Sequence, residues 1–273
     1  MVEQLPIYRV RARNTSTDSE NKIHDNTVAS RFGFSGGLVP GVVVFGYLTA
    51  PIVARFPEWL ERGSMQVRFT CPFYDGDPLE VRAEAEHNGD LISINALALN
   101  AYGTICATAS ASVPGELHCV DEPQSSKYRN RPLPSAESRL AATRDALIPG
   151  TVLGSLVERL NLKADQEGVL QQINERLPVY YGVSAAAHPM VILGLANHML
   201  MHNVALGPWI HASSELTNFS LARDGEEITV RGSIAEQFER KGHEFVVLDL
   251  LLTASDRLVQ QVRHTAIYMI RPA

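Results

Sequence analysis

Two stretches of the chain are apolar at almost every position. Residues 40–55 (PGVVVFGYLTAPIVAR) and 189–203 (PMVILGLANHMLMHN) each open with proline, which suits the first position of a helix. A helix that is apolar on every side must be buried on every side. The pattern therefore predicts two helices that other elements enclose.

Stretches in which apolar and polar residues alternate follow each predicted helix. In residues 79–87, for example, Val81, Ala83 and Ala85 alternate with charged residues, as in a strand with one buried face. The predicted strands cover residues 64–71, 79–87, 91–100 and 104–113 in the first half, and 210–221, 226–239, 243–253 and 258–270 in the second. A short strand is also expected ahead of each helix, at 6–14 and 151–160.

The two halves repeat one unit. Landmarks of the first half return with a shared offset of 149 residues: Gly33 as Gly182, Pro40 as Pro189, Asp75-Gly76 as Asp224-Gly225, and Val81-Arg82 as Val230-Arg231. A constant offset indicates duplication of a strand, an irregular segment, a buried helix and four antiparallel strands. A curved antiparallel sheet can enclose such a helix. We therefore predict an α+β chain with units at 1–118 and 143–273, joined by a polar, proline-containing linker at 119–142.

Composition and charge narrow the class of protein. The 273 residues are 45% apolar, and no apolar run reaches the ~18 residues of a membrane-spanning helix. The start, MVEQLPIYRVRARN, lacks the apolar core of a signal peptide, so we expect a cytoplasmic protein. A formal charge of −6 argues against nucleic acid as a partner. Cys71, Cys106 and Cys119 match no metal-ligand spacing, and we expect them to be free thiols in a reducing compartment.

The candidate chemistry lies in residues 21–41, NKIHDNTVASRFGFSGGLVPG. The segment Asn21-Lys22-Ile23-His24, then Gly33-Phe34, then Leu38-Val39-Pro40-Gly41 before a helix, resembles the MaoC-like hydratase/dehydratase family. The resemblance implies a tandem double hot-dog fold, in which two antiparallel sheets each wrap a helix and form a pseudo-dimer. It also implies an enzyme of fatty-acid metabolism. Such an enzyme hydrates 2-enoyl thioesters, or dehydrates 3-hydroxyacyl thioesters, of coenzyme A or acyl carrier protein, without a cofactor.

The sequence departs from the family pattern in two places. The family aspartate falls on Ser19, which Asp18 and Glu20 flank, and the family histidine before the helix glycine is Pro40. In the second half the positions of Asn21 and His24 are occupied by Leu170 and Ile173, so we expect one active site, in the first half.

The resemblance and the chemistry together assign roles to these residues. His24 would activate water, because the pKa of histidine lies near the working pH. Asn21 would orient the imidazole or the water, and Ser19 would stand in place of the aspartate. Gly41, at a helix N-terminus whose N–H groups are unpaired, would stabilise the thioester oxygen. The other predicted substrate-binding residues are Gly36, Gly37, Pro40 and Val42. The acyl chain would lie along the seam between the halves.

Other functions stay open on the sequence alone. A thioesterase of this fold usually has a carboxylate near the helix, and residues 33–57 contain none. A catalytically inactive acyl-thioester-binding or partner subunit would explain Ser19. His198 and His202, with His211 nearby, have a spacing that could bind a metal, but the glutamate of an HExxH motif is missing. We expect interior or interface histidines there and no metal. Association of the pseudo-dimer into a further homodimer also stays open.

Overall fold

The computed structural model describes residues 2–115 and 122–271. Its two long helices are α2 (Gly41–Arg55) and α5 (Pro189–Asn203), as the apolar stretches predict. The strands are β1 (Val2–Gln4), β2 (Tyr8–Arg11), β3 (Ser64–Phe69), β4 (Pro78–Asn88), β5 (Leu91–Leu99), β6 (Ile105–Pro114), β7 (Leu140–Ala141), β8 (Leu156–Arg159), β9 (Val204–Ala205), β10 (Ile210–Asn218), β11 (Glu227–Arg240), β12 (His243–Ala254) and β13 (Arg257–Met269). The short helices are η1 (Lys22–His24), α1 (Asn26–Ser30), α3 (Trp59–Arg62), η3 (Ser125–Lys127), η4 (Ala136–Ser138), η5 (Leu162–Gln166), α4 (Glu167–Gln172) and η6 (Pro178–Tyr180).

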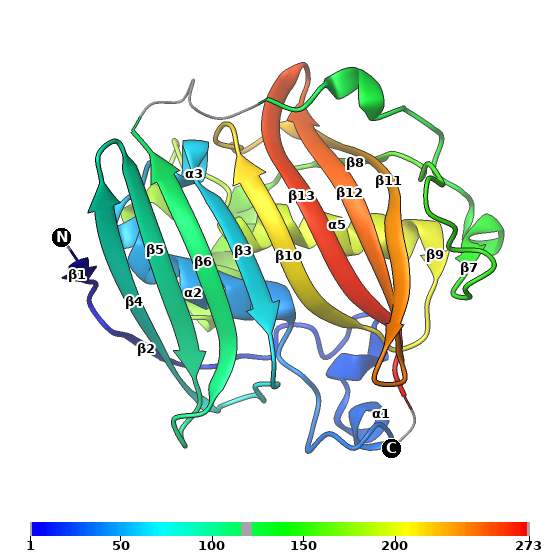
Figure 1. Ribbon diagram of the computed structural model, residues 1–273, viewed down its shortest axis with the longest axis horizontal. Helices are drawn as coiled ribbons and strands as arrows, with labels where there is room; N and C mark the ends of the chain where they lie inside the picture. The colour runs from blue at the N-terminus through cyan, green and yellow to red at the C-terminus, as the bar shows by residue number, and fades with distance from the viewer. Residues whose placement is uncertain (1, 116–121, 272–273) are drawn as a thin grey trace.

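The described strands form one large antiparallel sheet and one small pair. The large sheet has the order β1-β4-β5-β6-β3-β10-β13-β12-β11-β8, with β2 paired to β4, and β7 pairs with β9. Figure 1 shows α2 and α5 side by side on one face of this sheet. The order β4-β5-β6-β3 in one half returns as β11-β12-β13-β10 in the other. The predicted double hot-dog architecture is confirmed, and the two expected sheets are joined edge to edge through β3 and β10.

The junction of β3 and β10 shows the pseudo-twofold symmetry in its register. Gln66 pairs with Glu215, which is its own repeat equivalent, and their side chains form a hydrogen bond of 2.8 Å. On either side, Ser64 pairs with Thr217 and Arg68 with Ser213. Since Ser213 is the repeat equivalent of Ser64 and Thr217 that of Arg68, the two pairs are related by a twofold axis through the Gln66–Glu215 pair. An isologous dimer interface pairs residues in the same way. The duplicated chain has therefore kept the geometry of a symmetric dimer.

The two long helices approach closely near the start of α5. A Cβ atom added at Gly46 would lie 2.9 Å from His188 Cε1 and 3.4 Å from the Met190 Cβ, so only glycine fits there. Pro189 is the first residue of α5, whereas Pro40 is the residue before α2, with Gly41 its first. The equivalent turns also match, because Gly33 and Gly182 both have φ of 83°.

The described part of the predicted linker, residues 122–142, packs on the second half. Tyr128 is buried, and its hydroxyl donates to Asp249 Oδ1 at 3.1 Å. Arg131 N donates to Ser155 Oγ, and β7 pairs in parallel with β9. Residues 116–121, which include the end of the predicted first unit, the start of the linker and Cys119, lie outside the described residues. Among the described residues, no helix is long and apolar enough to span a membrane.

Cys71 and Cys106 form a disulfide, so the expectation of free thiols is wrong for this pair. Cys106 is in β6, and Cys71 follows β3, the strand beside it. Sheet pairing brings their Cα atoms to 4.5 Å although 35 positions separate them in the chain. Spacing alone could not reveal this, because it does not say which strands are neighbours.

Candidate active site

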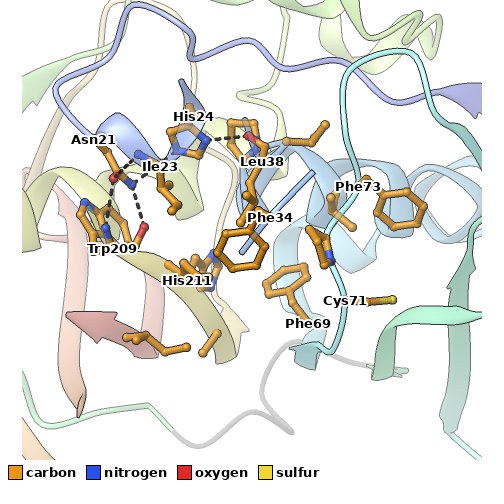
Figure 2. A pocket seen from close by; sticks show the side chains of 18 of the residues that line it. Asn21, Ile23, His24, Phe34, Leu38, Phe69, Cys71, Phe73, Trp209 and His211 are labelled. Carbon is orange, nitrogen blue, oxygen red and sulfur yellow. Dashed lines mark hydrogen bonds between the residues drawn. The ribbon is translucent and has the colours of Figure 1, made fainter. Parts of the chain in front are cut away.

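A cavity of about 220 Å³ lies at the seam between the two halves. The first half contributes the His24 segment, the start of α2 and the end of β3, and the second half contributes the start of β10 and single residues of α5, β12 and β13. Figure 2 shows His24 and His211 at this cavity, each from a different half, with Phe34 and Phe69 beside them. The lining is mainly apolar and aromatic, with few polar groups, as is typical of small-molecule sites.

His24 is the last residue of η1, and its ring is fixed against the segment that leads into α2. Its Nδ1 lies 2.7 Å from the Leu38 carbonyl oxygen, which can only accept, so Nδ1 carries the hydrogen and Nε2 carries a lone pair. Burial lowers the pKa of His24, and the hydrogen bond to Leu38 opposes this only in part. The imidazole is therefore neutral at pH 7, which is the form that a general base needs.

Asn21 connects the His24 segment to the second half. Its Oδ1 accepts from Trp209 N at 3.1 Å, and its Nδ2 donates to Trp209 O at 3.0 Å. The same Nδ2 lies 3.4 Å from His24 Nε2. Both ends of this buried amide are thus occupied by the backbone just ahead of β10. The contacts favour a positioning role for Asn21, which steadies the ring of His24 and holds β10 next to it.

The remaining predicted site residues divide into two groups. Pro40 and Gly41 line the cavity, whereas Ser19, Gly36, Gly37 and Val42 are not among the described residues that line it. Ser19 Oγ donates to the Asn21 carbonyl at 3.2 Å and so stabilises the turn before η1.

Gly37, the second residue of the glycine pair, is required for close packing beneath the site, whereas the space at Gly36 is only tight. A Cβ at Gly37 would lie 2.0 Å from the His24 carbonyl oxygen, and a Cβ at Gly36 would lie 3.1 Å from Asn26 Oδ1. Gly37 N also donates to Asn26 Oδ1 at 2.7 Å. The pair therefore fixes the loop against η1 and does not form the wall of the cavity.

The start of α2 offers free backbone donors to the cavity. Pro40 precedes the helix and supplies no side-chain cap, so the N–H groups of Gly41 and Val42 keep their capacity to bind an oxygen atom, whereas Val43 N donates to the Pro40 carbonyl at 2.9 Å. Gly41, the first helical residue, lines the cavity. The helix dipole adds positive potential at the same point.

No carboxylate lines the cavity in the described part of the chain. Asp18 is exposed, and Glu20 is exposed with its carboxylate 4.0 Å from Arg139. The carboxylate of Asp25 caps α1 by accepting from Val28 N at 2.9 Å. Among the described residues, no carboxylate therefore takes the place of the aspartate expected at position 19 from the resemblance to MaoC-like enzymes.

The second half contributes a polar residue that the sequence did not indicate as part of this site. His211, on β10, is 6% exposed, lines the cavity and packs edge-on against Phe69, with ring centroids 4.9 Å apart. A Cβ at Gly41 would lie 2.9 Å from His211 Nδ1, so this nitrogen lies against the start of α2. Only the junction of β3 with β10 brings His211 to the first helix, and no local pattern reports that junction.

The equivalent position in the second half is almost closed. A space of about 20 Å³ remains at the start of α5, bordered by Ala187, Pro189 and the buried side chain of Trp59. Leu170 and Ile173, at the positions of Asn21 and His24, are buried in the core. This half therefore has no histidine at the position of His24, and the histidine beside its helix N-terminus, His188, is fully buried and caps α5 by accepting from Met190 N at 3.2 Å.

The three histidines considered as metal ligands do not converge. His198 Nδ1 lies 2.7 Å from Glu158 Oε1, and His202 Nδ1 lies 2.9 Å from the His198 carbonyl. His211 Nε2 lies 2.8 Å from Ser214 Oγ. Within the described residues, no group of three or more His, Cys, Asp or Glu could hold a metal ion.

Comparison with solved structures identifies the fold. A MaoC-like dehydratase superposes with a TM-score of 0.63 at 16% identity, covering 100% of this chain and 98% of the other. The RV0216 protein of Mycobacterium tuberculosis, which has a double hot-dog fold, superposes with a TM-score of 0.60 at 13% identity over 97% and 96%. An acyl-ACP thioesterase from Bacteroides thetaiotaomicron superposes with a TM-score of 0.50 at 9% identity over 96% and 97%.

No protein-family model matches the sequence, and a search of curated proteins gives no match either. At such identities the structural likeness establishes the fold and leaves the reaction open. The fold and the cavity together define the class: a double hot-dog protein with a mainly apolar cavity at the seam between its halves.

Proposed function

We propose that the protein is a hydratase/dehydratase acting on 2-enoyl or 3-hydroxyacyl thioesters of coenzyme A or acyl carrier protein. One observation carries this proposal: a neutral histidine lines a mainly apolar cavity beside the free N-terminus of a buried helix. The cavity suits an acyl group, His24 suits the activation of water, and the start of α2 suits a thioester oxygen that gains negative charge. No cofactor is needed for this chemistry.

The reaction balances with His24 as the sole base. Nε2 of His24 takes a proton from water while the water oxygen bonds to the β carbon of the enoyl group. The electron pair of the double bond moves towards the thioester oxygen, where the N–H groups at the start of α2 stabilise the charge. The imidazolium then returns the proton to the α carbon, and the reverse sequence is dehydration. One group thus serves both proton transfers, which a site without a carboxylate requires.

The cavity favours a short acyl chain. Its volume of about 220 Å³ is below the range of roughly 300–1,000 Å³ that is usual for small-molecule pockets. Crotonyl-coenzyme A is therefore the first substrate to test. Phe34, Phe69 and Phe73 would contact its acyl group.

The test is hydration of crotonyl-coenzyme A, followed by the loss of enoyl absorbance. We expect turnover by the wild-type protein, and a loss of at least about 10²-fold in kcat for His24→Ala, the usual size of a general-base contribution. His198→Gln, a change of a half-exposed histidine on α5, is the matched control and should retain full activity. Turnover that survives His24→Ala would refute the assignment of the base.

A second candidate is a non-catalytic subunit that binds acyl thioesters. The absence of a lining carboxylate among the described residues favours it over thioester hydrolysis, for which hot-dog enzymes usually employ one. It predicts binding of acyl-coenzyme A by calorimetry with no turnover at any chain length. Release of free thiol, detected with a thiol reagent, would instead identify a thioesterase.

The cytoplasm stays our proposed compartment, and a further homodimer of the pseudo-dimer stays a proposal. The Cys71–Cys106 disulfide weighs against the cytoplasm, because structural disulfides are rare in reducing compartments. Mass spectrometry of protein blocked with a thiol reagent inside its own cells decides this point: alkylation of Cys71 and Cys106 supports the cytoplasm, and protection of both refutes it.

A further inference from the structure

Three buried side chains of the second half form a hydrogen-bonded chain that ends at the cavity. Ser214 Oγ, on β10, lies 2.8 Å from His211 Nε2 and 3.0 Å from Nδ1 of His264, on β13. Ser214 and His264 have no exposed surface, and His211 is 6% exposed. Within the described part of the chain, His211 Nδ1 and His264 Nε2 have no hydrogen-bond partner. Such groups are rare in protein interiors and need an explanation.

The single hydroxyl hydrogen of Ser214 determines which ring nitrogens carry hydrogen. Both rings are neutral, because burial lowers the pKa of His211 well below its ordinary value, against a contact with the Ser213 backbone that raises it, and burial lowers the pKa of His264 to about 3. If His211 donates from Nε2, the N–H of His264 is left at Nε2, fully buried and without an acceptor. If His264 donates from Nδ1, the hydroxyl of Ser214 donates to His211 Nε2, and the N–H of His211 is at Nδ1.

The second arrangement costs less. A buried N–H without an acceptor is rarer in proteins than a buried lone pair without a donor, because it costs more. The second arrangement leaves only a lone pair at the closed end of the chain, on His264. It places the unpaired N–H on His211, a residue that lines the cavity; Nδ1 itself is buried, so a ligand oxygen reaches it only with a small shift of the ring. The network therefore favours a hydrogen-bond donor at His211 Nδ1.

The position of this donor matches that of the proposed oxyanion site. Nδ1 would lie 2.9 Å from a Cβ at Gly41, so it is beside the first residue of α2 and its unpaired backbone N–H groups. Phe69 packs against the edge of the His211 ring and fixes its plane. Figure 2 shows His211 on the side of the cavity formed by β10, apart from His24. An oxygen atom bound at the start of α2 could accept from both.

We propose that His211 is a further catalytic residue, which donates a hydrogen bond from Nδ1 to the thioester oxygen at the start of α2. Ser214 and His264 are positioning residues that hold His211 in this tautomer. A neutral imidazole is an effective donor to a carbonyl group whose oxygen gains charge. This role rests on the proposed function, since it requires a thioester in the cavity. A catalytic role of His211 also explains why the second half, which has no equivalent of His24, contributes part of the site.

The test combines kinetics with the carbonyl stretching frequency of bound butyryl-coenzyme A, a saturated thioester that cannot be hydrated. Raman difference spectra report the strength of hydrogen bonds to the thioester oxygen. His211→Phe keeps the ring but removes the donor, and His198→Gln is the control. We expect His211→Phe to lower kcat for crotonyl-coenzyme A by about 10²-fold, as for loss of one oxyanion donor. The carbonyl frequency should rise towards its value in water.

The outcomes separate this inference from the proposed function. An unchanged carbonyl frequency in folded His211→Phe refutes the role of His211, and the proposed function survives if His24→Ala is still inactive. If wild-type protein binds butyryl-coenzyme A without hydrating crotonyl-coenzyme A, the proposed function fails. The carbonyl frequency alone then decides whether His211 donates to the thioester oxygen. If butyryl-coenzyme A does not bind, both fail. Should His211→Phe not fold, His211→Gln takes its place: its amide can reach Ser214 as Nε2 does but puts no donor at the Nδ1 position, so the carbonyl frequency must again rise.

Discussion

The buried histidines predict that mild acid destabilises the fold. His264 has no exposed surface, and burial lowers its pKa from 6.5 to about 3. Burial also lowers the pKa of His211 and of His188. Because these values lie below those of the unfolded chain, the unfolded chain binds the extra protons. Stability is therefore full above about pH 6.5 and falls as the pH drops from there towards the folded-state values.

The size of the effect follows from the linkage between protonation and folding. At pH 5 the histidine of the unfolded chain is nearly all protonated and folded His264 is still neutral. The pH lies about 1.5 units below 6.5, and each unit is worth about 1.4 kcal/mol, so His264 alone lowers the free energy of unfolding by about 2 kcal/mol between pH 7 and pH 5. His211 and His188 add to the loss in the same direction.

Urea unfolding at the two pH values measures this loss. Wild-type protein should lose at least about 2 kcal/mol, and His264→Leu should lose about 2 kcal/mol less between the same two pH values, whatever its stability at pH 7. If His264→Leu loses as much stability as wild type, His264 is not the neutral buried group that the tautomer argument requires.

Three further changes test other parts of the structure. Gly37→Ala would place a Cβ 2.0 Å from the His24 carbonyl oxygen, so thermal denaturation should show a loss of more than about 1–3 kcal/mol, with Gly36→Ala milder. Asn21→Ala would leave one backbone N–H and one backbone C=O of the second half unpaired, at about 1–3 kcal/mol each in urea unfolding. Reduction of Cys71–Cys106 should lower stability by up to about 4 kcal/mol, measured with and without reductant; no change would show that the bond does not constrain the chain.

The fold was predictable from the sequence because its signals are local or repeated. Apolar stretches identified α2 and α5, and the offset of 149 residues identified the duplication, which the pairing of Gln66 with Glu215 shows in space. The short strands were harder, since β2 spans Tyr8–Arg11 where 6–14 was expected, and β8 spans Leu156–Arg159 where 151–160 was expected. A short strand contains too few alternating apolar and polar residues for its ends to be distinguished from the loops around it.

The site was predictable only where one segment carries it. His24 and Gly41 are 17 positions apart, and both line the cavity, because η1 packs on the loop that precedes α2. The position of His211 at the cavity and the pairing of Cys71 with Cys106 depend on which strands become neighbours. No local sequence pattern indicates which distant strands will pair. The role of Gly37 was also hidden, since a glycine needed for close packing looks the same in sequence as a glycine in a mobile loop.

The asymmetry of the two halves follows from their shared seam. In a symmetric dimer each site takes its base from one subunit and part of its wall from the other, so a change that adapts the wall of one site also alters the second. Duplication into one chain removes that constraint. Here the first half keeps His24 and places Trp59 against the small space at the start of α5, whereas the second half has Ile173 at the position of His24 and presents His211 across the seam. The Asn21 amide, bonded to the Trp209 backbone, then ties the segment that carries His24 in one half to the strand that carries His211 in the other. If His211 donates as we propose, a half without an equivalent of His24 is still essential to the proposed reaction.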